Sequence, residues 1–546
     1  MKKRILAAVI AAVFAVLNVA SALPVFALAE STTRYPTPEG YNDHDYQKLV
    51  AFLEQTDYGG VKNGEKCSDN YDPNDPTTWE IYGGFQWIES DGEFRIQEIY
   101  VPYINLCGAL DVSGCTALYY LYCGSNNLTT LNVSGCTALT SLDCHYNNLT
   151  TLDVSGCTAL TSLDYEYNNL TTLDVSRNTA LTSLYCECNN LTSLDVSGCT
   201  ALTSLDCDYN NLSTLDVSSN TALKRLYCDS NNLTELDVSN NTALMDLCCD
   251  DNNLTSLDVS NNTALDDLSC SSNNLTTLDV SSNTALKDLS CSINKLTELD
   301  VSGNTALTSL SCYSNNLTSL DVSNNTALTS LSCPSNNLTE LDVSNNTALT
   351  SLACYENNLT ELDVSNNTAL ERLYCHDNNL TELDVSNNTA LERLYCYDNN
   401  LTELDLSNNT KLPIDHIYTE GKGFVGYTYY YGNRLYAVPQ DGESFLGWYN
   451  EDGELLSTNA EWNISGRKEK VFIAKFTGGE PEIIPGDADG DGELTFNDVT
   501  VLYYYLLNGD MAGMTPESLA SADLNNDGVI SVSDITLMFN LLLGGS

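Results

Sequence analysis

The chain has 546 residues, and its 22 Lys and Arg against 74 Asp and Glu give a formal net charge of −52 at pH 7. Binding to a phosphate backbone requires clustered Lys and Arg, so this charge excludes nucleic acid as an expected partner. Much of the acid lies in repeated Leu-Asp-Val-Ser segments, which indicates a solvated face.

The first residues have the three parts of a secretory signal peptide. A basic triplet at 2–4 precedes an apolar run from Ile5, and Ala27 and Ala29 form a cleavage site. We therefore expect residues 1–29 to be removed and the mature protein to be secreted without a membrane span. An uncleaved membrane anchor is the alternative, because the apolar run is long.

Residues 41–105 are predicted to form a small α/β cap at the N-terminal end of a repeat array. The segment 46–55 has helical patterning, and 80–101 contains strand-like runs that include Trp87 and Ile96. We expect the first coils of the array to begin directly after this segment.

Residues 106–412 are predicted to form a mainly β solenoid. A leucine recurs every 21 residues from Leu128 to Leu401 without a gap, and each unit contains two nested Leu-x-x-Leu-x-apolar halves of 11 and 10 residues. Both halves are expected to contain an extended Leu-x-Leu segment with alternate side chains inward. The pattern resembles the short bacterial, internalin-like leucine-rich repeats, and the preceding segment then resembles their N-terminal cap.

A single coil of this kind cannot be stable alone. Four Leu and one Val contribute roughly 10 kcal/mol of burial, whereas ordering 21 residues costs on the order of 30 kcal/mol. Stability must therefore come from stacking, as a sum of coil and interface contributions. Fourteen coils with strands about 4.8 Å apart make a rod on the order of 65 Å long.

The 21 cysteines follow the repeat and not the pattern of a disulfide framework. Stacked side chains point in parallel, whereas a disulfide needs two Cβ atoms turned toward each other, so we interpret these cysteines as buried free thiols. A metal ladder is the alternative, but the slot contains neither His nor Cys-x-x-Cys. Thirteen cysteines share one inward position, interrupted once by Tyr165: Cys123, Cys144, Cys186, Cys207, Cys228, Cys249, Cys270, Cys291, Cys312, Cys333, Cys354, Cys375 and Cys396. Four more occupy the Asn position of the turn: Cys115, Cys136, Cys157 and Cys199.

The two halves of the coil differ in how much they vary along the chain. The Leu-Thr-x-Leu-Asp-Val-Ser half is nearly constant, while the half that contains the Cys position varies, and variation marks the face that can recognise a ligand. When Leu and Cys point inward, strand geometry makes the residue between them point outward. Outward Tyr side chains can stack on sugars or anchor a protein interface, although drift of surface positions after recent duplication is an equally good explanation. The ligand-face candidates are Tyr122, Tyr185, Tyr227, Tyr374 and Tyr395.

Residues 413–477 are predicted to form a small β domain, because the repeat stops and the composition changes to Gly and aromatic residues. The runs Tyr-Tyr-Tyr-Gly at 429–432 and Gly-Trp-Tyr at 447–449 resemble the divergent internalin-B-type repeat of bacterial surface proteins. The resemblance implies a spacer and a C-terminal cover for the rod. Residues 478–485 are expected to be a linker.

Residues 486–546 contain two calcium-loop motifs whose first ligands lie 36 residues apart. Each motif supplies oxygen ligands at loop positions 1, 3, 5, 7, 9 and 12 and a Gly at position 6, where the loop turns sharply. The first loop offers Asp487, Asp489, Asp491, the carbonyl of Glu493, Thr495 and Asp498. The second offers Asp523, Asn525, Asp527, the carbonyl of Val529, Ser531 and Asp534. The sequence therefore predicts two Ca²⁺ sites.

Each loop is followed by apolar residues at helical spacing, for example Val499 and Leu502, or Ile535 and Met538. Pro485 precedes the first loop, so no entering helix fits there. The duplicated loop and helix resemble a type I dockerin, which implies binding to a cohesin module on the scaffolding protein of a cellulosome-type assembly. Matching the family's recognition positions residue by residue gives Phe496, Asn497, Tyr504, Tyr505 and Asn508 in the first copy and Val532, Ser533, Asn540 and Leu541 in the second. These differ from the Ser-Thr and Lys-Arg pairs of familiar dockerins and differ between the copies, so we expect one dominant binding mode.

The segments together indicate a secreted, noncatalytic recognition or adhesion protein. No segment outside cap, rod, β domain and dockerin is long enough for a catalytic barrel, and the four His residues lie beside no Gly-x-Ser-x-Gly or Cys nucleophile context. The expected partners are a cohesin, bound through the dockerin and Ca²⁺, and a polysaccharide or protein ligand on the repeat face. The alternatives are an accessory or catalytic component of polysaccharide degradation and a protein adhesin of the cell surface.

Overall fold

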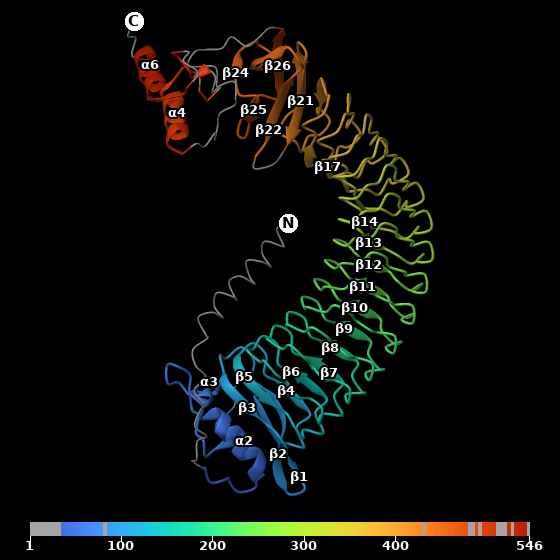
Figure 1. Ribbon diagram of the computed structural model, residues 1–546, viewed down its shortest axis with the longest axis vertical. Coiled ribbons are helices and arrows are strands. Elements are labelled where there is room, and N and C mark those ends of the chain that lie inside the picture. The colour runs from blue at the N-terminus through green and yellow to red at the C-terminus, as the bar shows by residue number, and fades with distance from the viewer. Residues whose placement is uncertain are drawn as a thin grey trace.

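The computed structural model describes residues 34–79, 84–428, 432–478, 486, 488–489, 494–508, 521–525 and 529–542. The described chain forms a curved solenoid with a helix-containing cap at one end and a β domain and a helical pair at the other (Figure 1). The predicted signal peptide and most of the predicted linker lie outside these residues. None of the described helices combines the length and the apolar character that a bilayer crossing requires.

The N-terminal cap contains the helix and the strands that the sequence predicts. Helix α2 (Asp43–Leu53) buries one face, and β1 (Phe85–Ser90) pairs antiparallel with β2 (Glu93–Tyr100). A short helix, α3 (Asn63–Cys67), and one 3-10 turn, η1 (Pro76–Thr78), lie between them. Strand β2 then pairs in parallel with the first strand of the array, so the cap continues the solenoid sheet and covers its edge.

One continuous parallel sheet runs along the inner, concave side of the arc (Figure 1). Each coil contributes three residues whose central Leu is buried, and neighbours pair with a constant offset of one repeat, as in Leu226 with Leu247. The strands are β4 (Tyr120–Tyr122), β6 (Ser141–Asp143), β7 (Ser162–Asp164), β8 (Ser183–Tyr185), β9 (Ser204–Asp206), β10 (Arg225–Tyr227), β11 (Asp246–Cys248), β12 (Asp267–Ser269), β13 (Asp288–Ser290), β14 (Ser309–Ser311), β15 (Ser330–Ser332), β16 (Ser351–Ala353), β17 (Arg372–Tyr374) and β18 (Arg393–Tyr395).

A turn closed by an Asn follows each strand. The residue before this Asn has a left-handed φ between 46° and 55° in fourteen successive coils, from Ser125 to Asp398. The Asn side chain then joins consecutive coils: Asn147 donates to the carbonyls of Cys123 and Cys144 and accepts from the Leu128 N–H at 2.9 Å. These bonds satisfy buried backbone groups that the short strands leave unpaired.

Both halves of the coil point alternate side chains inward as expected, but only one half pairs into a continuous sheet along the array. The constant half forms strands only at the two ends of the array, in β3 (Cys107–Asp111), β5 (Asn127–Asn132) and β19 (Glu403–Asp405). In the coils between them the Asp of Leu-Asp-Val-Ser accepts the N–H of the Ser two residues on, as Asp153 does from Ser155 at 2.9 Å. The same local hydrogen bond forms at Asp111, Asn132 and Asp405 in β3, β5 and β19, so it does not decide whether the segment pairs with its neighbours.

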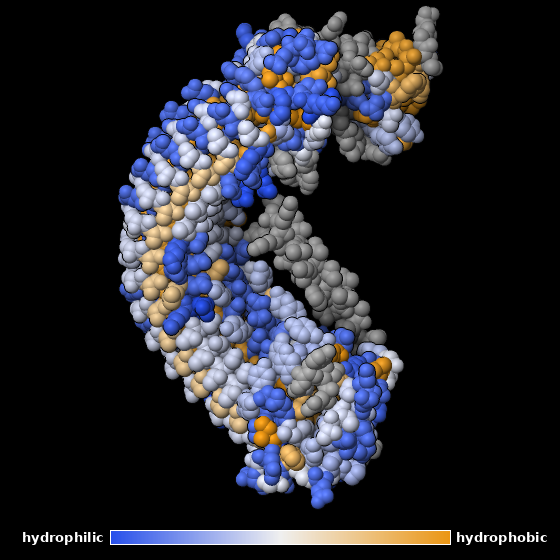
Figure 2. All heavy atoms as spheres, turned by 180° about the vertical axis from the view of Figure 1, so that it is seen from behind, coloured by the Kyte–Doolittle hydropathy of each residue, from blue (hydrophilic) through white to orange (hydrophobic). Residues whose placement is uncertain are grey.

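The cysteines are unpaired, as the sequence predicts, and all but Cys107, Cys188 and Cys248 are buried. All 21 are free thiols, and the thirteen in the inward column are fully buried. Cys136, in the Asn position, donates from Sγ to the Val112 carbonyl at 3.1 Å. In a later coil the side-chain amide of Asn178 makes the equivalent hydrogen bond, to the Val154 carbonyl. The outer side of the array is mainly hydrophilic, with a narrow, moderately hydrophobic stripe along its length (Figure 2).

The β domain after the array has two sheets. Strand β19 joins a five-stranded sheet in the order β19-β20-β26-β23-β24, and β21, β22 and β25 form a second sheet. The fully buried Trp448 is part of its core and donates from Nε1 to the Asn459 carbonyl at 3.1 Å. The strands are β20 (His416–Glu420), β21 (Gly423–Thr428), β22 (Arg434–Pro439), β23 (Glu443–Tyr449), β24 (Leu455–Ser457), β25 (Glu461–Asn463) and β26 (Val471–Gly478).

The described part of the C-terminal segment includes the helices α4 (Phe496–Asn508) and α6 (Val532–Leu542). They pack against each other around a small core that includes Val499, Leu502 and Met538. The periodicity in the sequence predicts both helices.

Candidate functional sites

The concave face presents three outward side chains from each coil. One is the first residue of the strand, which is arginine at Arg225, Arg372 and Arg393. The other two are the last residue of the strand and the residue that follows the buried cysteine position, since both alternate with inward Leu and Cys. Neither position carries Lys or Arg in any of the fourteen coils. The composition of the two positions changes along the array, from acidic to Ser-rich and then to aromatic.

In the N-terminal half of the array these positions form what we call the acidic strip. Its eight carboxylic side chains come from six successive coils and are all half-buried. Glu166, Glu187 and Asp206 bring their carboxylate oxygens within 4.8 Å of one another. The acidic strip consists of Asp143, Asp164, Glu166, Glu187, Asp206, Asp208, Asp229 and Asp250.

Burial and mutual repulsion oppose ionisation of the strip. Burial, together with the charges of neighbouring carboxylates, raises the pKa of Glu166 to about 8 and that of Glu187 to about 7. Burial also raises the pKa of Asp208, and the negative charge of Asp229 contributes to this increase. At neutral pH the strip therefore retains protons that a bound cationic group could displace. Three sets of side chains have donor atoms close enough together to share a cation: Asp143 with His145 and Asp164, Glu166 with Glu187 and Asp206, and Asp229 with Cys248 and Asp250.

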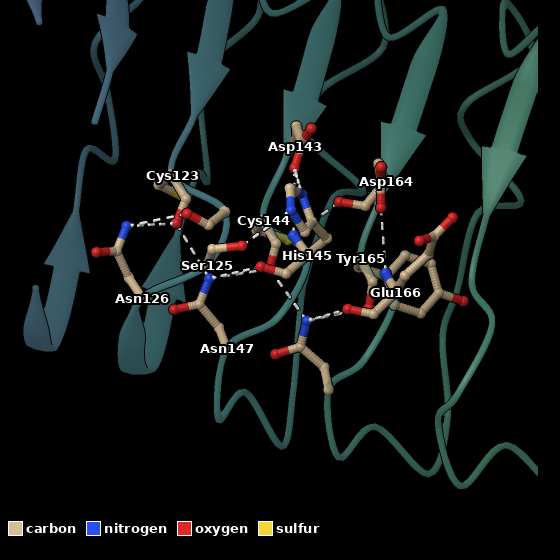
Figure 3. A network of polar contacts seen from close by, with 12 residues as sticks. Cys123, Ser125, Asn126, Asp143, Cys144, His145, Asn147, Asp164, Tyr165 and Glu166 are labelled. Atoms are coloured by element: carbon tan, nitrogen blue, oxygen red, sulfur yellow. Dashed lines mark hydrogen bonds and ion pairs between the residues drawn. The ribbon is translucent and has the colours of Figure 1, made fainter. Parts of the chain in front are cut away.

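A polar network surrounds His145 at the N-terminal end of the strip (Figure 3). The ring Nδ1 lies 2.5 Å from Asp143 Oδ1, and Nε2 lies 3.1 Å from the hydroxyl of Ser125 in the preceding coil. Asp143 Oδ1 also accepts the His145 N–H at 3.3 Å. The imidazole is therefore held at both nitrogens, between a carboxylate and a hydroxyl.

The Tyr residues predicted as ligand-face candidates lie on the concave sheet but are half-buried. The Tyr227 hydroxyl donates to Asp246, and the rings of Tyr374 and Tyr395 contact each other edge to face with centroids 4.8 Å apart. More exposed Tyr rings lie in the turns, with Tyr209 at 49% exposure. The five candidates thus lie on one face without forming a continuous stripe.

The C-terminal end of the concave face carries a column of stacked rings. Tyr355, His376 and Tyr397 stack with centroids 4.4 and 4.6 Å apart, and Tyr397 stacks on Tyr436 of the β domain. Burial lowers the pKa of His376 to about 4, so this ring is neutral in the column. The stack is a packing contact between the array and the β domain.

Reasoning from the sequence missed both the acidic strip and the His145 network. The strip has a readable signal, since the residue after the cysteine position is acidic in five successive coils, from Glu166 to Asp250. We assigned the acidic charge to the solvated Leu-Asp-Val-Ser segment and did not separate the two faces. The contact between Ser125 and His145 has no such signal, because it joins different coils.

The two calcium-loop motifs have the same local geometry wherever the structure describes them. The buried Asp498 accepts the N–H groups of Ala488 and Thr495 at 2.9 and 2.6 Å, and the buried Asp534 accepts the Ser531 N–H at 2.9 Å. Neither carboxylate is paired with Lys or Arg in the described part of the chain. A divalent cation fits these two loops, because the buried carboxylates of Asp498 and Asp534 have no compensating positive charge and the loops offer further oxygen ligands. Of the predicted ligands, Asp487, Asp491, Glu493 and Asp527 lie outside the described residues.

Most residues predicted to contact a cohesin are exposed. Phe496 and Tyr504 on α4 have exposures of 55% and 58%. Tyr505 instead packs against the core of the helical pair, so it offers little surface to a partner. Exposed residues without a sequence prediction extend the apolar surface: Tyr503, Leu507 and Phe539. The remaining predicted contacts, Asn497, Val532, Ser533, Asn540 and Leu541, are exposed, and nothing is described of the Asn508 side chain.

Comparison with known proteins gives matches for both parts of the chain. The Dockerin type I domain family matches residues 485–543, and a leucine-rich-repeat family matches residues 187–206. No curated protein matches the chain.

Among solved structures, the functional domain of InlJ from Listeria monocytogenes, described as including a cysteine ladder, is 36% identical to this chain. The match has a TM-score of 0.54 and covers 68% of this chain and 90% of that domain. The internalin InlF of Listeria monocytogenes is 24% identical with a TM-score of 0.45, over 56% of this chain and 85% of that one. A leucine-rich-repeat protein of Leptospira interrogans is also 24% identical, with a TM-score of 0.48, over 54% of this chain and 90% of that one.

Proposed function

We propose a function from the premise that this chain belongs to the internalin-like leucine-rich-repeat proteins and carries a C-terminal type I dockerin domain. The protein is a secreted recognition protein held on a cellulosome-type scaffold. The dockerin binds a cohesin when Ca²⁺ fills its two loops, and the concave face of the array binds a protein ligand. Leucine-rich repeats are protein-interaction scaffolds and type I dockerins are calcium-binding modules, so recognition at both ends agrees with the two domain types.

The acidic strip is the observation that supports a ligand class. Eight half-buried carboxylic groups on one face, with no Lys or Arg at the same positions, favour a partner segment rich in Lys and Arg. The raised pKa values of Glu166 and Glu187 indicate that no positive charge compensates these carboxylates. A cationic segment would supply that charge. We therefore assign the strip to a cationic protein segment.

A polysaccharide ligand is the second candidate. Stacking on a sugar needs a free aromatic face, but the rings of Tyr355, His376 and Tyr397 stack on one another. The exposed Tyr209 ring in a turn is what supports this candidate. It is tested in parallel with the protein ligand.

Binding to the strip can be tested with the full chain and a Lys- and Arg-rich peptide by calorimetry, beside affinity electrophoresis on a glycan panel. The combined variant Glu166→Gln, Glu187→Gln and Asp208→Asn should weaken peptide binding at least tenfold. The matched control, Glu235→Gln, Glu298→Gln and Glu340→Gln, removes the same charge from exposed positions of the constant half and should bind like the parent. An equal loss of peptide affinity in both variants would mean that net charge alone drives binding. Retardation by a glycan without peptide binding would favour a polysaccharide ligand over a cationic protein segment.

A pull-down with a cohesin-bearing scaffold fragment tests the other end of the molecule. Capture in Ca²⁺ and its loss in EDTA are the expected results, because the buried Asp498 and Asp534 require a cation for charge compensation. Capture that persists after complete chelation would contradict calcium dependence. Failure of capture in both conditions would contradict the cohesin assignment.

A further inference from the structure

The contact between Ser125 and His145 has the geometry of an activated nucleophile. The Ser125 hydroxyl lies 3.1 Å from His145 Nε2, and His145 Nδ1 lies 2.5 Å from Asp143 Oδ1 (Figure 3). A nucleophile, a base and a carboxylate that orients the base are the three parts of acyl-transfer sites on unrelated folds. The contact between Ser125 and His145 falls within the hydrogen-bonding range that such sites require, and the contact between His145 and Asp143 is slightly shorter.

Gly124 is what allows the imidazole to occupy this position. A Cβ atom on Gly124 would lie 2.4 Å from His145 Nδ1 and 3.0 Å from Asp143 Oδ1. The corresponding position carries a side chain in every later coil of the array, as in Glu166 and Asp208. Glycine therefore occurs at this position in the coil that lies next to His145.

The arrangement is not a general property of the repeat. Ser230, Ser272, Ser314 and Ser335 occupy the same turn position as Ser125. The residue that matches His145 in the next coil is Asp250, Ser292, Pro334 or Tyr355, respectively. Only Ser125 has an imidazole as its neighbour, so the other serines serve as internal controls.

The surroundings indicate the kind of substrate. Tyr103, Tyr122 and Tyr146 surround the imidazole with ring centroids 6.3, 5.7 and 5.6 Å away. The Tyr103 ring is 69% exposed, so the aromatic wall is open to solvent and to an incoming apolar group. The adjoining acidic strip disfavours anions, which points to a neutral ester with an apolar or aromatic acyl group.

We propose that Ser125, His145 and Asp143 form an ester-hydrolysing site on the first coils of the array. The Ser125 oxygen attacks the acyl carbon while its proton moves to His145 Nε2, and the C–O bond to the alcohol breaks as that proton passes to the leaving oxygen. Water then attacks the acyl-serine, gives a proton to His145, and releases the acid with Ser125 reprotonated. Asp143 holds the ring and stabilises the imidazolium. The Gly124 N–H, which has no acceptor among the described residues, precedes Ser125 in the chain and is the backbone donor that we assign to the oxyanion.

This activity goes beyond the proposed function and departs from the expectation of a noncatalytic protein. The repeat and the dockerin are noncatalytic domain types, but the three residues lie on outward positions that the repeat leaves free to vary. The activity does not depend on the cationic ligand or on a cohesin.

The test uses the full chain with a serine-reactive fluorophosphonate probe and with p-nitrophenyl butyrate as a neutral ester. Labelling should map to the peptide containing Ser125, and ester hydrolysis should fall at least a hundredfold in Ser125→Ala and in His145→Asn. The matched control Ser314→Ala should retain both signals. Ser125→Ala removes one partly buried hydroxyl, so an unchanged melting temperature separates loss of chemistry from loss of fold. Absence of labelling at Ser125, or hydrolysis that survives Ser125→Ala, overturns the proposal.

Discussion

The ring of Tyr397, on the last coil of the array, stacks on the ring of Tyr436 in the β domain with centroids 4.9 Å apart. In the same contact the N–H of Cys396 donates to the Tyr427 carbonyl at 3.0 Å. The β domain thus covers the open edge of the last coil with both backbone and ring contacts, and the hydrophobic core continues from one part into the other.

Gly426 should be the most sensitive position in this contact. A Cβ atom there would lie 2.4 Å from the Cα of Tyr397, so Gly426→Ala forces the two parts to separate. We expect a loss of about 1–3 kcal/mol in the free energy of unfolding, measured by urea titration of the full chain. Gly303→Ala, whose Cβ meets only the Ser281 carbonyl at 3.4 Å, is the control and should change stability little. Equal stability of both variants would contradict this docking.

Acid should stabilise the array through Glu166. The folded-state pKa of about 8 lies above the ordinary value of 4.5, so the folded protein binds more protons between these pH values. The stability from this group is complete below about pH 4.5 and is lost as pH rises to 8. Glu166→Gln should therefore raise the melting temperature at pH 8.5 and have no effect near pH 4. The gain should be on the order of 1 kcal/mol, since the half-exposed side chain is screened by solvent. A gain of equal size at both pH values would contradict the raised pKa.

Binding of a cationic peptide should strengthen as pH rises from 5 to 8. The peptide prefers ionised carboxylates, and the pKa values of Asp164, Glu187 and Glu166 are raised to about 6, 7 and 8. Binding should also release protons, which calorimetry in buffers of different ionisation enthalpy detects. Affinity that is flat over this pH range would exclude the acidic strip as the binding surface.

The thiols of the cysteine column should resist alkylation in the folded protein. Burial raises the pKa of Cys291 and Cys333 to about 12, so almost no thiolate exists near neutral pH. Mass spectrometry after brief N-ethylmaleimide treatment should find the thirteen column thiols unmodified and all of them modified in guanidinium chloride. The half-buried Cys107, whose pKa is raised less, provides the comparison within the same molecule, since any native labelling should begin there.

Asp498→Ala should abolish Ca²⁺ binding to the first calcium loop. The side chain is fully buried and accepts backbone N–H groups from both ends of the loop, so its removal leaves several donors unsatisfied, at a cost of about 1–3 kcal/mol each. Calcium titration monitored by circular dichroism should lose one of two binding events, and cohesin capture should weaken. Thr500→Ala, which removes only a hydroxyl bonded to the Phe496 carbonyl, is the control on the same helix.

The sequence alone was sufficient to predict the solenoid, its inward cysteine column and the two C-terminal helices. The reason is that a 21-residue period forces equivalent residues to stack, so the burial of Cys354 implies that of Cys333 and Cys375. The positions of Asp498 and Asp534 in duplicated loops were predictable for the same reason, because spacing within a short motif is a local property.

Only the tertiary structure decided which half of the coil forms the sheet and which side chains from different coils meet. Both halves of the coil have the same pattern of inward side chains, but only one of them pairs from coil to coil into the long sheet. Ser125 and His145 are 20 residues apart in the chain, and they come within hydrogen-bonding distance because stacking places one coil on the next and Gly124 leaves room for the ring. Periodicity therefore determines the architecture, whereas the chemistry of the concave face depends on contacts between coils at positions that the repeat does not constrain.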